Sequence, residues 1–399
     1  MDITIPPHIL SGKLQIIPSK SQAHRLLICA AFAVNPTTLI CPETNQDIEA
    51  TAGCLNAIGA KIIRTDTGYH IDPVRRIPKE AVLNCRESGS TLRFLLPIVG
   101  ALGIDTTFFL SGRLPNRPLS PLWEEMERKG CSLTRPTKET IRCQGKLSSG
   151  DYAIDGSVSS QFITGLLFAA SLMEGDSTIR ITGTMESKPY VDMTQQAMAL
   201  FGIDTDNFCI KGGQAYHSPE TVAVEGDWSN GAFFLAAKAL GSKVNIMGLR
   251  TDSMQGDRAV TDILSQMDNS MPAVSAKDIP DLIPILSVVA AAKHGAVFSD
   301  IRRLRLKESD RVASTVAMIR NLGGRADADE NTLKIYGTGL VGGTVDAVND
   351  HRIAMSAAIA ATVCSNDVTI LGAECVKKSY PRFWEEYARL GGNYEQHIR

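Results

Sequence analysis

Polar and charged side chains stand at the starts of several apolar, alanine-rich segments of this 399-residue chain. The first segment opens with Lys20, Ser21 and Arg25 and continues as an apolar run to Val34. One capping residue is enough to begin a buried helix, and a cap requires no cations. A helix N-terminus offers free backbone N–H groups and a positive dipole end, and arginine adds a fork that matches phosphate or carboxylate. Lys20, Ser21 and Arg25 together therefore predict an anion-binding site.

Other polar residues at such starts are open to two interpretations. Ser159, Ser160 and Gln161 begin a further apolar segment, and N-capping alone is sufficient to explain Ser159. Arg352 leads directly into an apolar run, which argues against an ordinary solvated charge. The remaining cations include Arg93, Arg113, Arg117, Lys307, Arg311, Lys377 and Lys378. Taken singly, most of them are explained more simply as solvated surface charges.

Two carboxylates also stand where chemistry is possible. Asp281 follows Pro280 and enters an apolar segment, where it either caps a helix or, with a raised pKa near cations, moves protons. Glu308 lies between Lys307 and Ser309 and is either an ordinary surface acid or a catalytic carboxylate. Spacing alone does not choose between these interpretations.

The elements that must position these side chains recur six times along the chain. Each recurrence begins with a predicted apolar helix opened by small polar residues, over residues 19–34, 88–102, 159–172, 227–240, 281–292 and 350–363. A strand-like run follows each helix, over residues 37–40, 106–110, 178–181, 244–247, 296–298 and 368–370. A helix that is apolar nearly all round is expected to be buried.

A second, amphipathic helix is predicted after each strand, for example over residues 48–60 and 312–324, where glycines close the helix. The repeating unit therefore mixes α and β structure, and six copies indicate two domains of three units each. Most starts lie roughly 70 residues apart, which is longer than solenoid periods. The alternative explanation is coincidence among common alanine-rich helices, but six ordered recurrences argue against it.

Composition excludes several classes of protein. The net charge is -2, from 41 basic and 43 acidic residues, which argues against a general nucleic-acid or membrane binder. Nine cysteines are scattered singly without metal-ligand spacing, so a reducing, cytoplasmic location is expected and no metal site is predicted. The apolar run at 26–34 looks like a signal-peptide core, but a strand-like stretch at 14–17 precedes it and similar runs recur.

Eight strings, in order along nearly the whole chain, resemble the 3-phosphoshikimate 1-carboxyvinyltransferase (EPSP synthase) family. The strings lie in residues 18–25, 88–93, 114–119, 155–162, 187–192, 278–281, 304–311 and 349–352. The resemblance implies an α/β fold of two domains, each with three βαβαββ units around a pseudo-threefold axis. One domain would be inserted in the other, with residues 1–16 plus 221–399 forming the first and residues 17–220 the second.

The resemblance also implies substrates and residue roles. Phosphoenolpyruvate would donate its enolpyruvyl group to the 5-hydroxyl of shikimate 3-phosphate, a step of the shikimate pathway to aromatic amino acids. Shikimate 3-phosphate would be held by Lys20, Ser21, Arg25, Ser159, Ser160, Gln161, Ser187, Asp281 and Lys307. Phosphoenolpyruvate would be held by Lys20, Gly89, Arg117, Arg311, Arg352 and Lys378.

The implied chemistry needs a base and a proton donor but no metal or organic cofactor. Asp281 would be the base toward the hydroxyl, and Glu308, with Lys20 or Lys378, would handle the proton at the methylene carbon. Such an enzyme is expected to act as a monomer, without nucleic-acid or membrane partners. The chain departs from the usual family pattern at Glu87, where asparagine is usual, and at Ser90, where threonine is usual.

Three rival functions remain open at this stage. A transferase that uses UDP-N-acetylglucosamine shares the fold, but it usually has a loop cysteine in the region 113–117, where this chain has none. A non-catalytic repeat scaffold would need no cations at buried helix starts. An RNA-end-processing cyclase with a related repeat would favour a basic chain.

Overall fold

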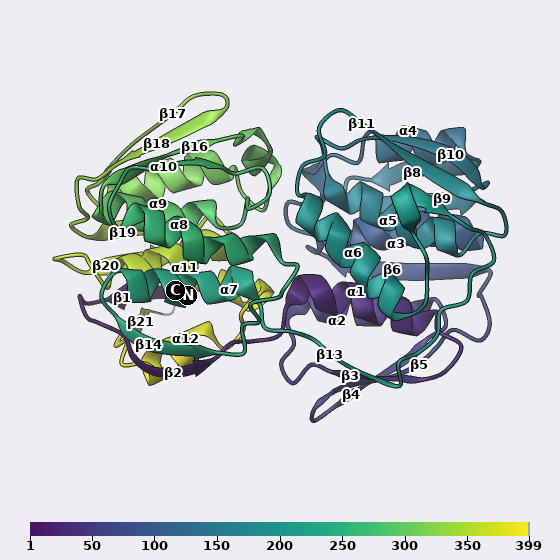
Figure 1. Ribbon diagram of the computed structural model, residues 1–399, viewed down its shortest axis with the longest axis horizontal. Coiled ribbons are helices and arrows are strands. Elements are labelled where there is room, and N and C mark those ends of the chain that lie inside the picture. The colour runs from purple at the N-terminus through teal and green to yellow at the C-terminus, as the bar shows by residue number, and fades with distance from the viewer. Residues whose placement is uncertain (398–399) are drawn as a thin grey trace. The chain divides into compact units, whose positions relative to one another are not determined.

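The computed structural model describes residues 1–397, and its chain forms two compact units. Unit 1 consists of Met1–Ile17 together with the described residues from Gly226 onward, and unit 2 consists of Pro18–Glu225. Both units mix short sheets with helices (Figure 1). Within the described residues, no helix is long and apolar enough to cross a membrane.

The predicted apolar helices are confirmed as the buried helices of the two units. In unit 2 they are α1 (Lys20–Ala31), α3 (Gly89–Leu102) and α5 (Ser160–Ser171). In unit 1 they are α7 (Trp228–Ala239), α9 (Ile283–Ala292) and α11 (His351–Ala360). Serine or aspartate side chains cap five of the six N-termini, namely Ser19, Ser88, Ser159, Asp227 and Asp350.

A second helix follows in each repeat, as predicted, and α2, α4 and α10 pack against strands of the sheets. These helices are α2 (Gln46–Ala57), α4 (Leu122–Arg128), α6 (Lys188–Leu200), α8 (Val260–Met267), α10 (Arg311–Asn321) and α12 (Phe383–Arg389). Short 3-10 helices occupy Leu114–Asn116, Asp206–Phe208, Gly256–Ala259, Arg302–Leu306 and Ala373–Lys378.

Three sheets lie in unit 2. The first orders its strands β6 (Glu80–Arg86), β7 (Asp105–Leu110), β9 (Thr140–Gly145) and β8 (Cys131–Thr137). The second orders β13 (Thr221–Ala223), β3 (Thr37–Ile40), β5 (Gly68–Asp72) and β4 (Lys61–Thr65). The third contains β10 (Gly150–Asp155), β11 (Ser177–Thr182) and β12 (Cys209–Ile210).

Three sheets also lie in unit 1. One orders β15 (Ala273–Ser275), β16 (Gly295–Ser299), β18 (Thr332–Tyr336) and β17 (Arg325–Ala328). Another orders β19 (Gly343–Asp346), β20 (Val368–Leu371), β1 (Asp2–Ile5) and β21 (Glu395–His397). The third pairs β14 (Lys243–Met247) with β2 (Ser11–Gln15).

The four larger sheets share one plan. In each, the first two strands pair in parallel and the remaining pairs are antiparallel, for example β6 with β7 and then β7 with β9. In three of the four sheets, one buried helix lies between the two parallel strands along the chain, whereas β3 and β13 are far apart in sequence. Because parallel strands need a crossover connection, the buried helix is the natural link between them. The predicted α/β repeat is therefore confirmed.

The chain passes twice between the units, after Ile17 and after Glu225. The sequence predicted that the chain would return to the first domain before residue 221. In the structure β13 (Thr221–Ala223) pairs in parallel with β3, and this pairing keeps residues 221–225 within unit 2. A three-residue strand gives little signal in the sequence, since its partner lies far away along the chain.

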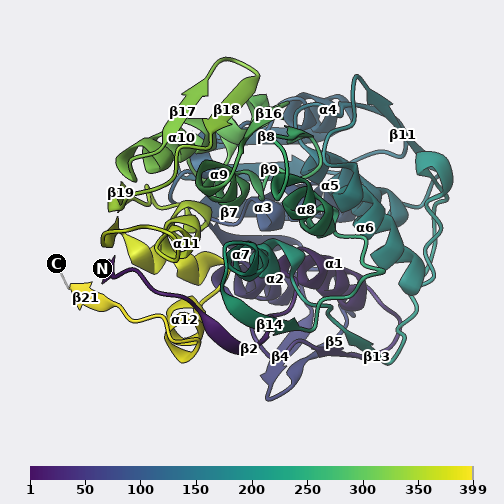
Figure 2. The ribbon, with the colours of Figure 1, turned by 60° about the vertical axis from the view of Figure 1, so that its left-hand side comes forward.

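The buried helices make the core of each unit. In unit 1, α7, α9 and α11 pack against one another in pairs and appear nearly end-on in Figure 2. In unit 2, α3 packs closely on α5, and Gly165 lies at the contact. A Cβ atom at Gly165 would lie 2.2 Å from the carbonyl oxygen of Arg93 and 3.0 Å from Pro97.

Gly165→Ala is therefore expected to push α3 away from α5 and to lower the free energy of unfolding by about 1–3 kcal/mol. Gly53→Ala is the matched control, because a Cβ at this exposed position of α2 meets nothing within 4 Å. This control is expected to raise stability by about 0.5–1 kcal/mol. Urea unfolding of both variants measures the difference, and equal stabilities would contradict the proposed close packing.

Candidate functional site

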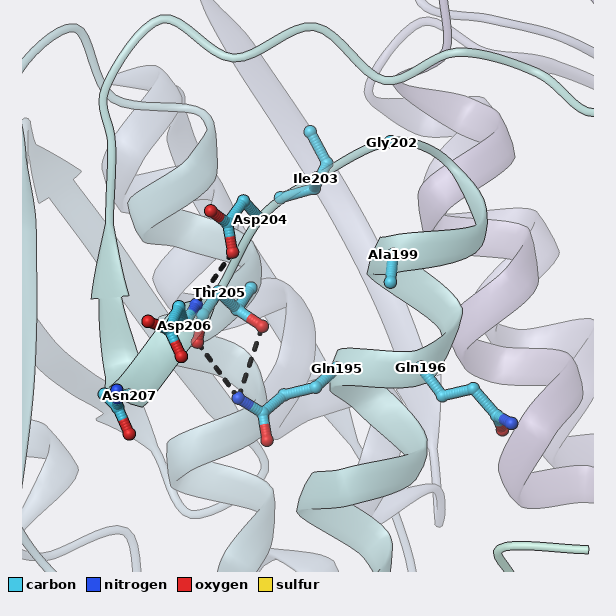
Figure 3. Close-up of a pocket in the computed structure, with 9 residues that line it drawn as sticks. All are labelled: Gln195, Gln196, Ala199, Gly202, Ile203, Asp204, Thr205, Asp206 and Asn207. Carbon is cyan, nitrogen blue, oxygen red and sulfur yellow. Dashed lines mark hydrogen bonds between the residues drawn. The ribbon is translucent and has the colours of Figure 1, made fainter.

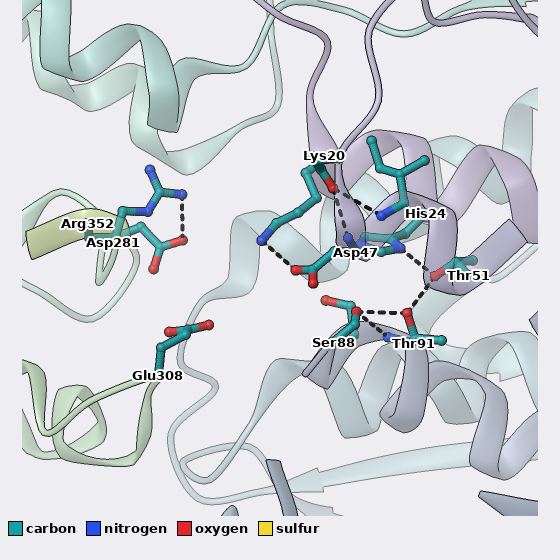
Figure 4. Close-up of polar contacts among 12 residues, drawn as sticks. Lys20, His24, Asp47, Thr51, Ser88, Thr91, Asp281, Glu308 and Arg352 are labelled. Carbon is teal, nitrogen blue, oxygen red and sulfur yellow. Dashed lines mark hydrogen bonds and ion pairs between the residues drawn. The ribbon is translucent and has the colours of Figure 1, made fainter. Parts of the chain in front are cut away.

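Lys20, the first residue of α1, is held by a carboxylate of the next helix. Its Nζ lies 2.8 Å from Oδ2 of Asp47, which stands in the first turn of α2 (Figure 4). Both side chains are partly buried. The ion pair joins the N-termini of α1 and α2, so the ammonium group is fixed in place at the start of a buried helix.

The backbone at Gly89 is bordered by two guanidinium groups. A Cβ atom at Gly89 would lie 2.6 Å from Nη1 of Arg93 and 2.7 Å from Nη1 of Arg117. Only glycine leaves room here, and its N-terminal position on α3 turns free backbone N–H groups toward the same region. The start of α3 therefore combines the helix dipole with arginine, which suits an anion.

Gln161 links the starts of α3 and α5. Its Oε1 accepts a hydrogen bond from Nη1 of Arg93 at 3.2 Å, and its Nε2 donates to Oγ of Ser90 at 2.9 Å. Ser159 caps α5 by accepting from the backbone N–H of Gln161 at 3.3 Å, and Ser160 is buried. The capping interpretation of Ser159 is thus confirmed.

Arg25 lies inside unit 2 and braces α1 against α6. Its Nε donates to Oγ1 of Thr194, and its two terminal nitrogens donate to the carbonyl oxygens of Ser21 and Tyr190. Burial lowers the pKa of Arg25 to about 10, although Tyr190 and Cys29 act in the opposite direction. Ser187, which precedes α6, is buried and has a left-handed φ of 55°.

In unit 1, one buried guanidinium collects three carboxylates. The Nε of Arg311 donates to Asp350 at 3.0 Å, Nη1 donates to Asp281 at 2.7 Å, and Nη2 donates to Glu308 at 2.6 Å. Arg311 is 1% exposed, whereas Asp281 and Glu308 keep 23% and 25% exposure. The two predicted catalytic carboxylates are therefore brought together by one arginine, and both side chains stay partly exposed.

Asp281 is not a helix cap, so the capping interpretation is wrong. Leu282 stands at the N-cap position of α9, and no side chain caps that helix. The oxygens of Asp281 face Arg311 and, at 3.9 Å, Lys307. They also face Arg352 at 3.4 Å (Figure 4). Burial alone would raise the pKa of Asp281, but Lys307, Arg352 and Arg311 together hold it well below its usual range.

Arg352 and Lys307, two cations near Asp281, are candidates to bind an anionic ligand. Arg352 is 2% exposed, and its Nε and Nη1 have no hydrogen-bond acceptor within residues 1–397. Burial lowers the pKa of Lys307 to about 8, against the attraction of Asp281. Lys378, from the end of its 3-10 helix, donates through Nζ to the carbonyl oxygen of Asn349 at 2.8 Å.

The sequence analysis missed three acidic residues that organise the site. Asp350 caps α11 and also accepts from Ser309 and Arg311, while Asp47 holds Lys20. Asp257 accepts a short hydrogen bond from Ser229, and burial together with the charge of Asp281 raises the pKa of Asp257 to about 7. The sequence does not reveal these roles, because the partners of the three aspartates are remote along the chain.

A pocket elsewhere in unit 2 is a poor candidate for the predicted chemistry. It has a volume of about 600 Å³ and is lined by the end of α6 and the turn that follows, up to Asn207 (Figure 3). Its lining holds Asp204 and Asp206 but no lysine or arginine, which disfavours an anionic ligand. None of the predicted site residues lines it. No group of residues within the described chain is arranged to hold a metal ion.

Comparison with known proteins decides the family. The model of the family described as EPSP synthase (3-phosphoshikimate 1-carboxyvinyltransferase) matches residues 5–387. The chain belongs to the EPSP synthase family. Proteins named 3-phosphoshikimate 1-carboxyvinyltransferase from Clostridium kluyveri and Clostridium beijerinckii are 39% and 38% identical to it, each over 99% of this chain and 98% of its own length.

The fold agrees with this family assignment. A solved structure of EPSP synthase from Acinetobacter baumannii superimposes with a TM-score of 0.80 and covers all of both chains at 22% identity. The resemblance seen in the sequence is thus confirmed, and the two-domain α/β fold of EPSP synthases is the fold of this chain. These matches do not favour the nucleotide-sugar transferase, the scaffold or the cyclase.

Asp350→Ala is expected to lower the free energy of unfolding by about 3–5 kcal/mol, because it leaves the buried Arg311 without its Nε partner. Asp252→Ala is the matched control, since Asp252 pairs with Arg250 while both side chains are exposed. Exposed pairs contribute at most about 1 kcal/mol. Denaturant unfolding compares the two, and a loss at Asp350 no larger than that at Asp252 would contradict the description of the cluster.

Proposed function

We propose that this member of the EPSP synthase family transfers the enolpyruvyl group of phosphoenolpyruvate to the 5-hydroxyl of shikimate 3-phosphate and releases phosphate. The observation that carries the proposal is the set of three cations, Lys307, Arg311 and Arg352, that surround Asp281. Each substrate carries a phosphate and a carboxylate. Four anionic groups need cations that are already held in place, because fixed charges require no reorganisation during reaction.

In this proposal, residues of both units bind shikimate 3-phosphate. Lys20 supplies a fixed ammonium group at the start of α1, and Lys307 supplies a second one beside Asp281. The buried serines at the start of α5 and before α6 add hydroxyl donors. The complete set is Lys20, Ser21, Arg25, Ser159, Ser160, Gln161, Ser187, Asp281 and Lys307.

Phosphoenolpyruvate is proposed to bind to arginines and to the glycine at the start of α3. The two nitrogens of Arg352 without acceptors match a carboxylate or phosphate. The guanidinium of Arg117 beside Gly89 supplies a second fork. The complete set is Lys20, Gly89, Arg117, Arg311, Arg352 and Lys378.

The two compact units are proposed to be the two domains of the enzyme. We also propose that the enzyme works as a monomer in the cytoplasm, in keeping with its unpaired cysteines.

In this proposal, Asp281 becomes a stronger base when the substrates bind. Lys307, Arg352 and Arg311 hold its pKa low, although burial opposes them. When phosphate and carboxylate groups of the substrates neutralise these cations, the depression is relieved and the carboxylate becomes a stronger base. Asp281 then takes the proton of the 5-hydroxyl. Glu308, with Lys20 or Lys378, is proposed to deliver a proton to the methylene carbon.

Phosphate release from phosphoenolpyruvate tests the function. Turnover is expected with shikimate 3-phosphate and not with UDP-N-acetylglucosamine. Asp281→Asn is expected to lower kcat by about 10²–10⁴-fold through loss of the base, whereas the exposed Asp252→Asn leaves kcat unchanged. Turnover only with the nucleotide sugar would overturn the acceptor, and full turnover of Asp281→Asn would overturn the base.

A further inference from the structure

Four side chains with no assigned role form a continuous row of hydrogen bonds inside unit 2. Nδ1 of His24 lies 2.7 Å from Oγ1 of Thr51, which lies 2.7 Å from Oγ1 of Thr91, which lies 2.7 Å from Oγ of Ser88 (Figure 4). All four side chains are fully buried. The row runs from α1 through the middle of α2 to the N-cap of α3, so it connects three helices.

The direction of the row follows from counting hydrogens. Oγ1 of Thr91 donates its one hydrogen to Ser88, so Thr51 must donate its own to Thr91. Thr51 then has no hydrogen left for His24, and Nδ1 of His24 must be the donor to Thr51. Every hydrogen therefore points from α1 toward Ser88.

The surroundings of His24 fit this single arrangement. Its Nε2 is buried without a hydrogen-bond partner within residues 1–397, and its ring packs edge-on against Phe94. Burial, with the charges of Lys20 and Arg25, keeps the pKa of His24 well below its usual range. The imidazole is thus neutral and carries its hydrogen on Nδ1.

The row ends where the glycine motif begins. Oγ of Ser88 accepts both the hydroxyl and, at 3.3 Å, the backbone N–H of Thr91, which fixes the first turn of α3. Gly89 follows directly and borders the guanidinium groups of Arg93 and Arg117. At the other end, Lys20 lies one helical turn before His24 and is itself tied to α2 through Asp47.

We propose that the row His24, Thr51, Thr91 and Ser88 positions the start of α3 against α1, so that the N–H groups at Gly89 meet the anionic donor substrate. These are positioning residues, since they act through Ser88 and Gly89. The inference rests on the proposed function, because the donor substrate is phosphoenolpyruvate in that proposal. Apolar packing alone would not require the hydroxyl groups, and this difference makes the inference testable.

Thr51→Val breaks the row at its centre while keeping the shape of the side chain. Thr51→Ser restores the hydroxyl. Thr106→Val is the matched control, because Thr106 is also fully buried in unit 2 and donates only to the carbonyl oxygen of Ile104. The KM values for both substrates and kcat are measured for all three variants and the unchanged enzyme.

Thr51→Val is expected to raise the KM for phosphoenolpyruvate about tenfold and to change the KM for shikimate 3-phosphate less than about twofold. Thr51→Ser and Thr106→Val should stay within about twofold of the unchanged enzyme for both substrates. An unchanged KM for phosphoenolpyruvate in Thr51→Val, or a parallel rise for both substrates, would overturn the proposal. Absence of turnover in the unchanged enzyme would instead reject the proposed function.

A spectroscopic measurement keeps the inference open to test if Thr51→Val fails to fold. The ¹⁵N resonances of the His24 ring, identified by their loss in His24→Asn, report which nitrogen carries the hydrogen. The row predicts a hydrogen on Nδ1 in the unchanged enzyme and in Thr51→Ser. A neutral ring protonated on Nε2 would overturn the direction of the row and, with it, the proposal, whatever the activity.

Discussion

The guanidinium of Arg311 is the interaction on which the arrangement of unit 1 depends. It is buried, and it binds Asp350 at the start of α11, Asp281 before α9 and Glu308 before its own helix, α10. A buried charge without partners is very unfavourable, so the three segments must come together for this arginine to be tolerated. The apolar helices supply the stability, and the arginine fixes which of their ends meet.

In unit 2, an ion pair and smaller polar side chains connect the buried helices to one another and to α2. Its helix starts are joined by the Lys20–Asp47 ion pair, by the hydroxyl row that begins at His24, and by Gln161 between α3 and α5. In both units the sides of the buried helices are apolar and the polar groups gather at the N-termini, where free N–H groups and the dipole favour anions. The repeat thus places polar and cationic groups at the N-termini of its buried helices in several copies.

The sequence was sufficient to predict the repeat and to propose candidate residues, because both depend on local patterns. Apolar helices, their polar starts and the strands after them follow from spacing and from capping chemistry. The partners of those residues do not follow from local patterns, because they are distant in sequence. Arg352 lies 71 positions from Asp281, and Tyr190 lies 165 positions from Arg25. For the same reason β13 escaped detection, since only its pairing with β3 makes it a strand.

We propose that cations beside Asp281, Lys307 among them, are held in place for use by anionic substrates. The pH dependence of shikimate 3-phosphate binding tests it most directly, because burial lowers the pKa of Lys307 to about 8. Lys307 is charged below that pH and loses its charge above it, so affinity should fall about tenfold per pH unit above pH 8. Lys307→Arg stays charged and should bind with an affinity that does not change over this range. The same pH dependence in both proteins would contradict the claim.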